Sequence, residues 1–282
     1  MSGGLDSGVC LYMIRRSAHC AVLAVILLAS ATAAAQSAGE QEVWKHFLTW
    51  YKTYSGSLLP PDVVKAYSAS LISEGLTPAD VTARVAVLKK IGATSPPEMM
   101  TLHFNKMFTQ QQGLFSTEPN ALLARAVREL KPGKALDVAM GQGRNSVFLA
   151  RQGWEVTGYD LSDQGLAIAR ANAAKAGVTI NTIFASHQEF DFGKDRWDLI
   201  VMTYAFVSME DAAFLQRVRD SLKPGGIVVV EQLNSGGPGP GPANALFRSF
   251  QDLRVLHYED TSDTADWSQK KARIGRLVAQ KE

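Results

Sequence analysis

The sequence predicts an α/β protein in which helices cover both faces of a mostly parallel, doubly wound sheet. Apolar runs of strand length alternate with stretches of helical periodicity, and glycine turns separate them. A strand over residues 135–139 is followed by a Gly-Gln-Gly turn, a helix over residues 145–152 and a strand over residues 154–159. Two more buried strands are expected at residues 197–202 and 227–231. Strands that alternate with helices form parallel sheets because each crossover helix packs back onto the sheet.

The N-terminal side, residues 36–112, is expected to be a helical extension. Helices are predicted over residues 41–54, 61–73, 78–91 and 97–110, and three of them begin at a proline that suits the first turn. Four aromatic residues recur at helical spacing, namely Trp44, Phe47, Trp50 and Tyr51. This spacing favours core packing, and the alternative is that some of these rings help to cover a ligand pocket.

The turn after the first predicted strand has the chemistry of a nucleotide-binding half-site. Gly141 and Gly143 permit a tight turn and let a ligand approach the backbone, while the next helix offers unpaired N–H groups. Asp160 ends the second strand, where a carboxylate can accept both hydroxyl groups of a ribose. Asp137 places a second carboxylate nearby, which favours a neutral or cationic cofactor over a pyrophosphate. The alternative is an ordinary tight turn of an α/β protein.

A resemblance to class I S-adenosylmethionine-dependent methyltransferases rests on three segments in order: GQGRNSVFLARQGWEVTGYDLS, WDLIVM, and LKPGG before a buried strand. The first segment is similar to the branch that includes the tellurite-resistance and thiopurine methyltransferases, and the likeness extends from about Phe104 to the C-terminus. The resemblance implies a Rossmann-like, doubly wound sheet of seven strands, mostly parallel, with an antiparallel last strand. Residues 253–258 and 273–279 would form its terminal hairpin.

The resemblance also implies S-adenosylmethionine as the cofactor and assigns its contacts by position. The expected cofactor-binding residues are Asp137, Met140, Gly141, Gly143, Asp160, Leu161, Ser186, His187 and Thr203. Ser186 stands where an aspartate is common, and its hydroxyl accepts a hydrogen bond from the adenine amino group more weakly than a carboxylate would. Ala139 replaces the first glycine of the usual turn, which matters only where the backbone needs a positive φ or touches the ligand.

A nicotinamide dinucleotide is disfavoured by the same turn. A dinucleotide site needs a third glycine or an alanine for close helix packing, and Ser146 takes that place. The LKPGG turn is likewise a feature of the methyltransferase pattern. We therefore expect S-adenosylmethionine and no dinucleotide.

The expected function is methyl transfer from S-adenosylmethionine to a small-molecule acceptor, with a thiol or metalloid-type nucleophile favoured by the resemblance. Phe115, Asn120 and Tyr204 are the expected substrate-binding residues, and the alternative for Phe115 and Asn120 is a structural role at a helix start. A soft nucleophile needs no general base because the sulfonium methyl group is already electrophilic. Structural roles are favoured for His103, His187 and Tyr204, so no catalytic base is named. The alternative function is a non-catalytic S-adenosylmethionine-binding or envelope interaction protein that retains the fold.

Residues 1–35 have the pattern of a secretory signal peptide or of an uncleaved signal-like anchor. Arg15 and Arg16 precede a run of about nine apolar residues, and small residues lead to Ala35. That run is shorter than the roughly 20 residues that span a bilayer, so no stable membrane span is expected. Cleavage near Ala35 predicts export to the bacterial periplasm or the medium, whereas a retained segment predicts a cytoplasmic or inner-face tethered protein. Export conflicts with a cofactor made in the cytoplasm, and this conflict stays open, as does the choice between Met1 and Met13 as the start.

The methyltransferase domain is expected over residues 113–282, with a Gly/Pro-rich stretch at 234–242 that is either a lid over the acceptor pocket or a surface loop. A formal net charge of +2 without a clustered Lys/Arg stripe gives no reason to expect nucleic acid as a partner. Cys10 and Cys20 both precede the expected cut, which excludes disulfides, thiolate metal sites and cysteine catalysis in a mature chain. No metal is expected, and the oligomeric state is not specified by the sequence.

Overall fold

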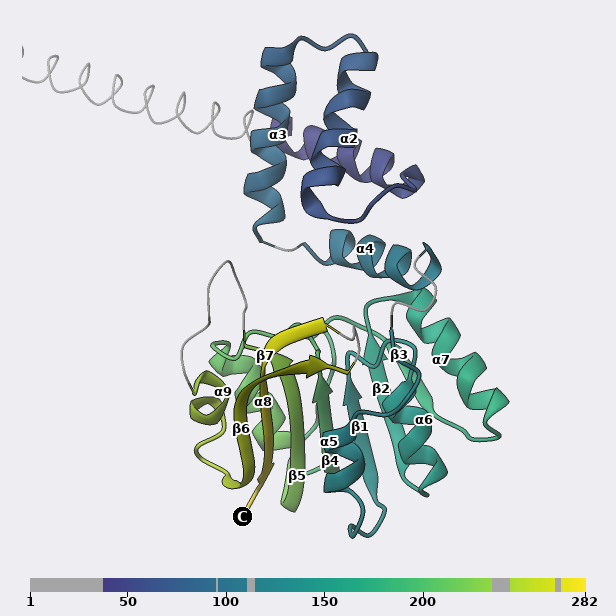
Figure 1. Ribbon diagram of the computed structural model, residues 1–282, viewed down its shortest axis with the longest axis vertical. Helices are drawn as coiled ribbons and strands as arrows, with labels where there is room; N and C mark the ends of the chain where they lie inside the picture. The colour runs from purple at the N-terminus through teal and green to yellow at the C-terminus, as the bar shows by residue number, and fades with distance from the viewer. Residues whose placement is uncertain (1–37, 95, 111–114, 235–243, 267–269) are drawn as a thin grey trace, which may run out of the picture. The chain divides into compact units, whose positions relative to one another are not determined.

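The computed structural model describes residues 38–94, 96–110, 115–234, 244–266 and 270–282 (Figure 1). Contacts within the chain divide it into two compact units, Met1–Pro96 and Pro97–Glu282. The predicted signal segment at 1–35 and residues 235–242 of the Gly/Pro-rich stretch lie outside the described residues, so both assignments stay predictions.

The first unit is built from helices. Residues 38–53 are helical and are followed by α2 (Pro60–Ser73) and α3 (Pro78–Gly92), close to the predicted bounds. Thr77 caps α3 through a capping box with Asp80, in which each side chain accepts from the other residue's backbone N–H. Phe47 and Tyr51 are buried at 6% and 0% exposure, and the Phe47 ring lies 5.1 Å from the Tyr67 ring. These two aromatic residues therefore have the predicted core position.

A seven-stranded sheet forms the centre of the second unit, with the order β3-β2-β1-β4-β5-β7-β6. Its strands are β1 (Lys134–Val138), β2 (Glu155–Asp160), β3 (Asn181–Phe184), β4 (Trp197–Thr203), β5 (Leu222–Leu233), β6 (Arg254–Ala265) and β7 (Lys270–Gln280). The first five strands pair in parallel, and β7 lies antiparallel between β5 and β6. The predicted Rossmann-like fold with an antiparallel last strand is confirmed.

Helices cover both faces of this sheet (Figure 1). They are α5 (Ala121–Ala126), α6 (Arg144–Arg151), α7 (Asp163–Lys175), α8 (Ala212–Ser221) and α9 (Ala245–Ser249), whereas α4 (Pro97–Gln110) packs against α7. Neighbouring side chains of β1 pack on opposite faces of the sheet. Leu136 belongs to one core cluster with Phe214 of α8, whereas Ala135 belongs to another with Leu149 of α6. A strand that is buried on both faces reads as a continuous apolar run, which is why periodicity identified it.

The terminal hairpin is longer than predicted, since β6 and β7 pair from Arg254 opposite Gln280 to Ala265 opposite Lys270. The second half of β6 is polar and lacks the alternation that marks a half-buried strand. Cross-strand ion pairs hold it instead, such as Arg273 Nε at 2.7 Å from Asp260 Oδ1.

Helix α4 belongs to the second unit, although its residues fall within the predicted extension at 36–112. It packs against α7, and Asn105 Nδ2 donates to Asp163 Oδ1 at 2.6 Å. This contact brings α4 to the end of β2, where the predicted ribose carboxylate lies.

Candidate functional site

The turn between β1 and α6 needs glycine for two separate reasons. Gly141 and Gly143 have φ values of +53° and +77°, which side chains rarely adopt. A Cβ at Gly143 would lie 2.8 Å from Cβ of Ala169, and one at Gly141 would lie 3.0 Å from Cζ of Phe108. Ala139, where the family has its first glycine, also has a positive φ of +53°. A glycine would adopt this φ without strain, whereas the alanine of this chain is strained there.

Asp160 is fixed at the end of β2 with its carboxylate facing the glycine turn. Its Oδ2 accepts from the Gly141 N–H at 2.8 Å and its Oδ1 accepts from the Ser162 N–H at 2.7 Å. The residue is 7% exposed, and burial raises the pKa of its carboxyl group while these backbone donors lower it. Each oxygen has a second lone pair, so the carboxylate can still accept the two hydroxyl groups of a ribose.

Asp137, in β1, is the second buried carboxylate of this region, at 2% exposure. Its Oδ2 accepts from the Ser146 hydroxyl at 2.7 Å. Burial raises the pKa of Asp137 to about 6, against the opposing effects of the Ser146 hydrogen bond and the Arg144 charge, and Asp160 raises it further. A ligand cation would relieve this deficit of positive charge, whereas a pyrophosphate would add to the repulsion. The residues thus fit the ammonium group of S-adenosylmethionine better than the phosphates of a dinucleotide.

On the predicted adenine side, Ser186 and His187 follow β3 and hold hydrogen bonds within the protein. The buried Ser186 hydroxyl donates to Glu189 Oε2 at 2.8 Å. His187 Nε2 donates to the carbonyl of Ala205 at 3.1 Å, so its Nδ1 accepts from the Tyr159 hydroxyl at 2.9 Å. Burial lowers the pKa of His187, which keeps the ring neutral. These hydrogen bonds hold His187 within the protein, and the cofactor contacts expected of Ser186 and His187 stay predictions.

The three other predicted cofactor residues, Met140, Leu161 and Thr203, differ in burial and in their place on the fold. Met140 is 5% exposed and packs in a small core cluster with Leu166 and Ala169. Leu161 is half-buried directly after β2. Thr203 ends β4, and its Oγ1 accepts from Asn145 Nδ2 at 2.8 Å. Thr203 and Leu161 thus lie at strand ends, while the Met140 side chain is part of the core beneath the turn.

The predicted acceptor residues Asn120 and Tyr204 meet at one carboxylate oxygen. Asn120 Nδ2 donates to Glu231 Oε1 at 2.9 Å, and the Tyr204 hydroxyl donates to the same oxygen at 2.6 Å. Asn120 is fully buried and its Oδ1 caps α5 by accepting from the Leu123 N–H at 3.0 Å. Tyr204 is half-buried with a φ of +55°, and burial and Glu231 raise the pKa of its phenol. Asn120 therefore caps α5, as the alternative expected, and its role in acceptor binding stays a prediction.

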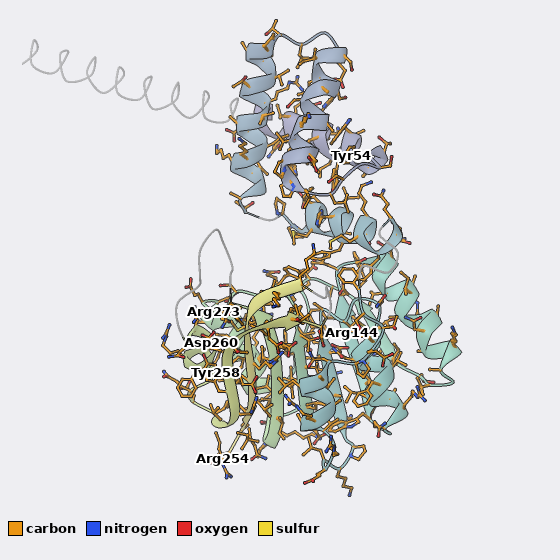
Figure 2. The ribbon with its side chains drawn as sticks, in the orientation of Figure 1. Tyr54, Arg144, Arg254, Tyr258, Asp260 and Arg273 are labelled. Atoms are coloured by element: carbon orange, nitrogen blue, oxygen red, sulfur yellow. The ribbon has the colours of Figure 1, made fainter. Side chains whose placement is uncertain are left out.

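Arginines from distant elements complete this network. Arg276 of β7 lies 2.7 Å from Glu231 Oε2, and Arg144 at the start of α6 lies 2.9 Å from Asp266 Oδ1 (Figure 2 labels Arg144). Asp266 also accepts from Asn120 Nδ2 at 2.8 Å. The network ties the glycine turn, the start of α5 and the tip of the terminal hairpin to the end of β5.

Glu231 and Phe108 belong to the site but were not predicted from the sequence. Glu231 stands at the end of an apolar run and is 2% exposed. Because a buried charge requires partners, its place in the sequence could have identified it as part of a polar network. Phe108 lies over the glycine turn, and the predicted acceptor residue Phe115 lies beside it with ring centroids 5.0 Å apart. No pattern in the sequence marks Phe108, because its contact depends on where α4 packs.

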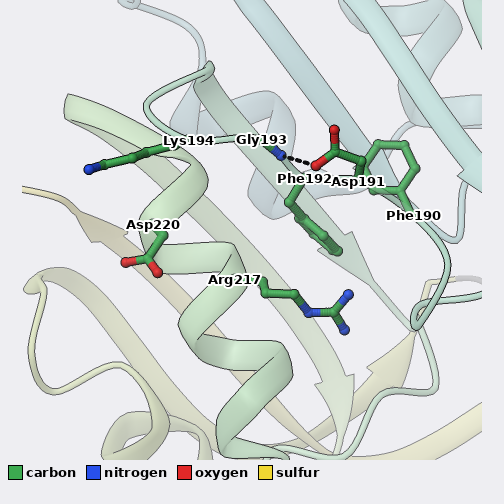
Figure 3. Close-up of a pocket in the computed structure, with 7 residues that line it drawn as sticks. All are labelled: Phe190, Asp191, Phe192, Gly193, Lys194, Arg217 and Asp220. Atoms are coloured by element: carbon green, nitrogen blue, oxygen red, sulfur yellow. Dashed lines mark hydrogen bonds between the residues drawn. The ribbon is translucent and has the colours of Figure 1, made fainter.

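A separate open pocket of about 340 Å³ lies between α8 and the segment before β4 (Figure 3). Residues 190–194, Arg217 and Asp220 line it, and none of them is a predicted cofactor or acceptor residue. Its charges cancel, because Lys194 and Arg217 are matched by Asp191 and Asp220. This pocket gives no reason to move the candidate site away from the glycine turn.

Two further features are absent from the described ranges. No group of three or more His, Cys, Asp or Glu residues in these ranges could hold a metal ion. None of the helices in those ranges combines the length and the apolar character that crossing a bilayer requires.

Comparison with known proteins agrees with this geometry. The family described as methyltransferase domain matches residues 135–226. An uncharacterized methyltransferase of Synechocystis is 31% identical over 155 residues, which cover 54% of this chain and 67% of that protein. The chain belongs to the class I S-adenosylmethionine-dependent methyltransferases. The crystal structure of TehB from Haemophilus influenzae covers 64% of this methyltransferase and 67% of its own chain, with a TM-score of 0.53 and 21% identity, which shows the shared fold.

Other curated relatives match shorter parts of the methyltransferase. The probable S-adenosyl-L-methionine-dependent methyltransferase TehB of Haemophilus influenzae is 25% identical over 146 residues, covering 48% of this chain and 51% of that protein. A ubiquinone biosynthesis O-methyltransferase of Azorhizobium caulinodans is 30% identical over 112 residues, covering 39% and 44%. The methyltransferase therefore spans about half the length of these relatives. The resemblance inferred from the sequence is confirmed.

Proposed function

We propose that this methyltransferase transfers the methyl group of S-adenosylmethionine to a small-molecule nucleophile. The pair of buried carboxylates beside the glycine turn carries the proposal. Asp160 is held by two backbone N–H groups in a position to accept ribose hydroxyls, and burial raises the pKa of Asp137 to about 6. The ammonium group of the cofactor's methionine end would place a positive charge beside the Asp137 carboxylate.

The chain's part in the reaction is to bind, orient and exclude water. When bound, the cofactor supplies an electrophilic methyl group; a lone pair of the acceptor forms the new bond to carbon as the carbon–sulfur bond breaks, which leaves S-adenosylhomocysteine. Such a transfer gains most of its rate from alignment of the reactants and exclusion of water. Phe108 lies over the turn with Phe115 beside it, and the two rings would supply apolar cover.

For the acceptor we propose a thiol or metalloid-type nucleophile, as the family resemblance favours. The two candidate bases Tyr204 and His187 support an acceptor that needs no general base. The Tyr204 hydroxyl donates to Glu231, and both ring nitrogens of His187 hold hydrogen bonds within the protein. Because these groups already hold hydrogen bonds within the protein, none of them is placed to take a proton from a protic acceptor.

The test is calorimetric titration of the protein with S-adenosylmethionine and, separately, with NAD. Micromolar binding of S-adenosylmethionine alone supports the cofactor assignment, and binding of NAD alone contradicts it. A panel of thiol, selenite and tellurite acceptors is then followed by formation of S-adenosylhomocysteine. Binding without turnover on the whole panel would instead favour a non-catalytic cofactor-binding or envelope protein.

Export through residues 1–35 remains a separate proposal. It is supported by the arginines, the short apolar run and the small residues that precede Gln36. Mass spectrometry of the protein from periplasmic and cytoplasmic fractions tests it. A mature N-terminus near Gln36 in the periplasm supports export, and an intact N-terminus in the cytoplasm contradicts it.

A further inference from the structure

Helix α4 contacts the two segments that hold the Asp160 carboxylate. Backbone N–H groups of Gly141 and Ser162 donate to this carboxylate at 2.8 and 2.7 Å. Gly141 lies in the glycine turn and Ser162 at the start of α7, the helix against which α4 packs (Figure 1). We propose that Asn105 of α4 is a positioning residue for the cofactor, because it holds the Ser162 donor and thereby directs the carboxylate toward the ribose. The inference rests on the ribose role proposed for Asp160.

Asn105 joins α4 to the start of α7 by three hydrogen bonds. Its Oδ1 accepts from the Ser162 hydroxyl at 2.6 Å and from the Gln164 N–H at 3.3 Å, and its Nδ2 donates to Asp163 Oδ1 at 2.6 Å. Ser162 is fully buried, and its hydroxyl oxygen also accepts from the Gly165 N–H at 2.9 Å as the N-cap of α7. The hydroxyl proton and one lone pair are thus both used, so rotation of Ser162 would break a buried hydrogen bond.

Ser162 carries the link from Asn105 to the ribose carboxylate. Its side chain donates to α4, and its N–H donates to Asp160 Oδ1, two positions earlier in the chain. The other carboxylate oxygen, Oδ2, accepts from Gly141. With both oxygens held, the carboxyl group cannot turn about its terminal bond, which fixes the directions in which it accepts ribose hydroxyl groups. Such preorganisation of a binding group by its supporting residues raises affinity.

The Phe108 ring gives α4 a second, apolar contact with the same two segments. A Cβ at Gly141 would lie 3.0 Å from Cζ of Phe108, and one at Gly165 would lie 2.9 Å from its Cε2. Gly165 is buried in α7 and its φ is not positive, so its own backbone does not require glycine. Glycine is less favourable than alanine inside a helix, and the approach of the Phe108 ring accounts for it there. Asn105, three positions before Phe108, lies on the same face of α4.

The experiment is calorimetric titration of the full chain with S-adenosylhomocysteine and with its analogue that lacks both ribose hydroxyl groups. Asn105→Ala should bind S-adenosylhomocysteine about three- to tenfold more weakly than wild type, because the ribose carboxylate loses one support. The sugar of the analogue makes no hydrogen bond with that carboxylate, so the variant and the wild type should bind it equally. Alanine favours a helix, so α4 itself should persist in the variant.

Thr109→Ala is the matched control. Thr109 is exposed on the same helix, and its hydroxyl donates to the Asn105 carbonyl at 2.8 Å within α4. This variant should bind both ligands as the wild type does. Asn105→Ala is also combined with Asp160→Ala, where the further loss should stay below about twofold, since the two changes act on one interaction. Circular dichroism melts identify a variant that loses its fold, and Asn105→Gln, which displaces the amide by one methylene, then replaces Asn105→Ala.

The outcomes separate this inference from the proposed function. If Asp160→Ala weakens binding of S-adenosylhomocysteine and Asn105→Ala does not, the inference is overturned and the ribose role of Asp160 stands. If Asp160→Ala binds normally, the ribose role fails and the inference fails with it. An equal loss for the two ligands in Asn105→Ala would show a purely structural role and would also overturn the inference.

Discussion

The cofactor side and the acceptor side of the site are assembled in different ways. On the cofactor side, Asp160 reaches Gly141 across 19 positions of sequence and Ser146 reaches Asp137 across nine. On the acceptor side, Asn120 bonds Glu231 across 111 positions and Asp266 across 146. The first side is one contiguous segment, whereas the second needs nearly the whole second unit in place. The cofactor function can therefore be altered locally, and changes on the acceptor side should affect the stability of the whole unit.

The largest expected effect comes from Glu231→Ala on the acceptor side. It leaves the Arg276 charge and the donors of Asn120 and Tyr204 without their shared partner. Removal of one member of a buried ion pair costs about 3–5 kcal/mol in the free energy of unfolding. Urea denaturation measures it. Glu231→Gln keeps an oxygen for Asn120 and Tyr204 and should lose less, and equal losses in the two variants would contradict the hydrogen-bond part of this account.

On the cofactor side, Asp160→Ala should act on binding more than on stability. Loss of hydrogen bonds from the ribose to a carboxylate should weaken S-adenosylmethionine by about 1–3 kcal/mol, or roughly 5- to 150-fold. Calorimetric titration checks this, with the exposed acid Glu210→Ala as the control. Unchanged affinity in Asp160→Ala would remove Asp160 from the ribose role.

Asp137→Asn should separate stability from binding on the same side. The folded-state pKa of Asp137, about 6, lies above its ordinary value of 3.8, so the ionised carboxylate destabilises the fold. This destabilisation is absent below pH 4, grows between pH 4 and 6, and is complete above pH 6. The asparagine variant should therefore be more stable than wild type by about 1–3 kcal/mol at pH 7.5, with no difference near pH 4.

The same change should weaken cofactor binding, because a neutral amide does not attract the ammonium group. In the wild type, affinity for S-adenosylmethionine should fall as the pH drops below about 6, since protonation of Asp137 removes the charge. Calorimetry at pH 5 and pH 7.5 measures both effects. A variant that is more stable but binds normally would show that Asp137 does not face the cofactor.

The smallest expected effect is a gain in stability from Ala139→Gly. Ala139 has a φ of +53°, and relief of this strain should add about 1 kcal/mol to the free energy of unfolding. Ala171→Gly at an exposed position in the interior of α7 is the matched control, with an expected loss of about 0.5–1 kcal/mol. A loss of stability in both variants would mean that position 139 gains nothing from glycine.

The contrast between the two sides also decides what could be predicted from the sequence. The parallel strands, the glycine turn and Asp160 were identified because the chemistry lies in one run with a clear period. Glu231 and Arg276 were missed because neither residue has a local partner, and only the sheet order brings them together. The second half of β6 was missed because ion pairs with β7, rather than alternating apolar residues, hold it.

The position of β7 has a consequence for how the molecule is made. This strand lies between β5 and β6, yet it comes last in the sequence. During synthesis, β5 is finished well before Arg276 exists, so Glu231 has no countercharge from Arg276 until 45 more residues have been added. A chain cut short after Gly275 would keep the glycine turn and both cofactor carboxylates. It would lack residues 276–280 of β7, which pair with both β5 and β6. We expect such a product to be a substrate for cellular proteases rather than a partly active enzyme.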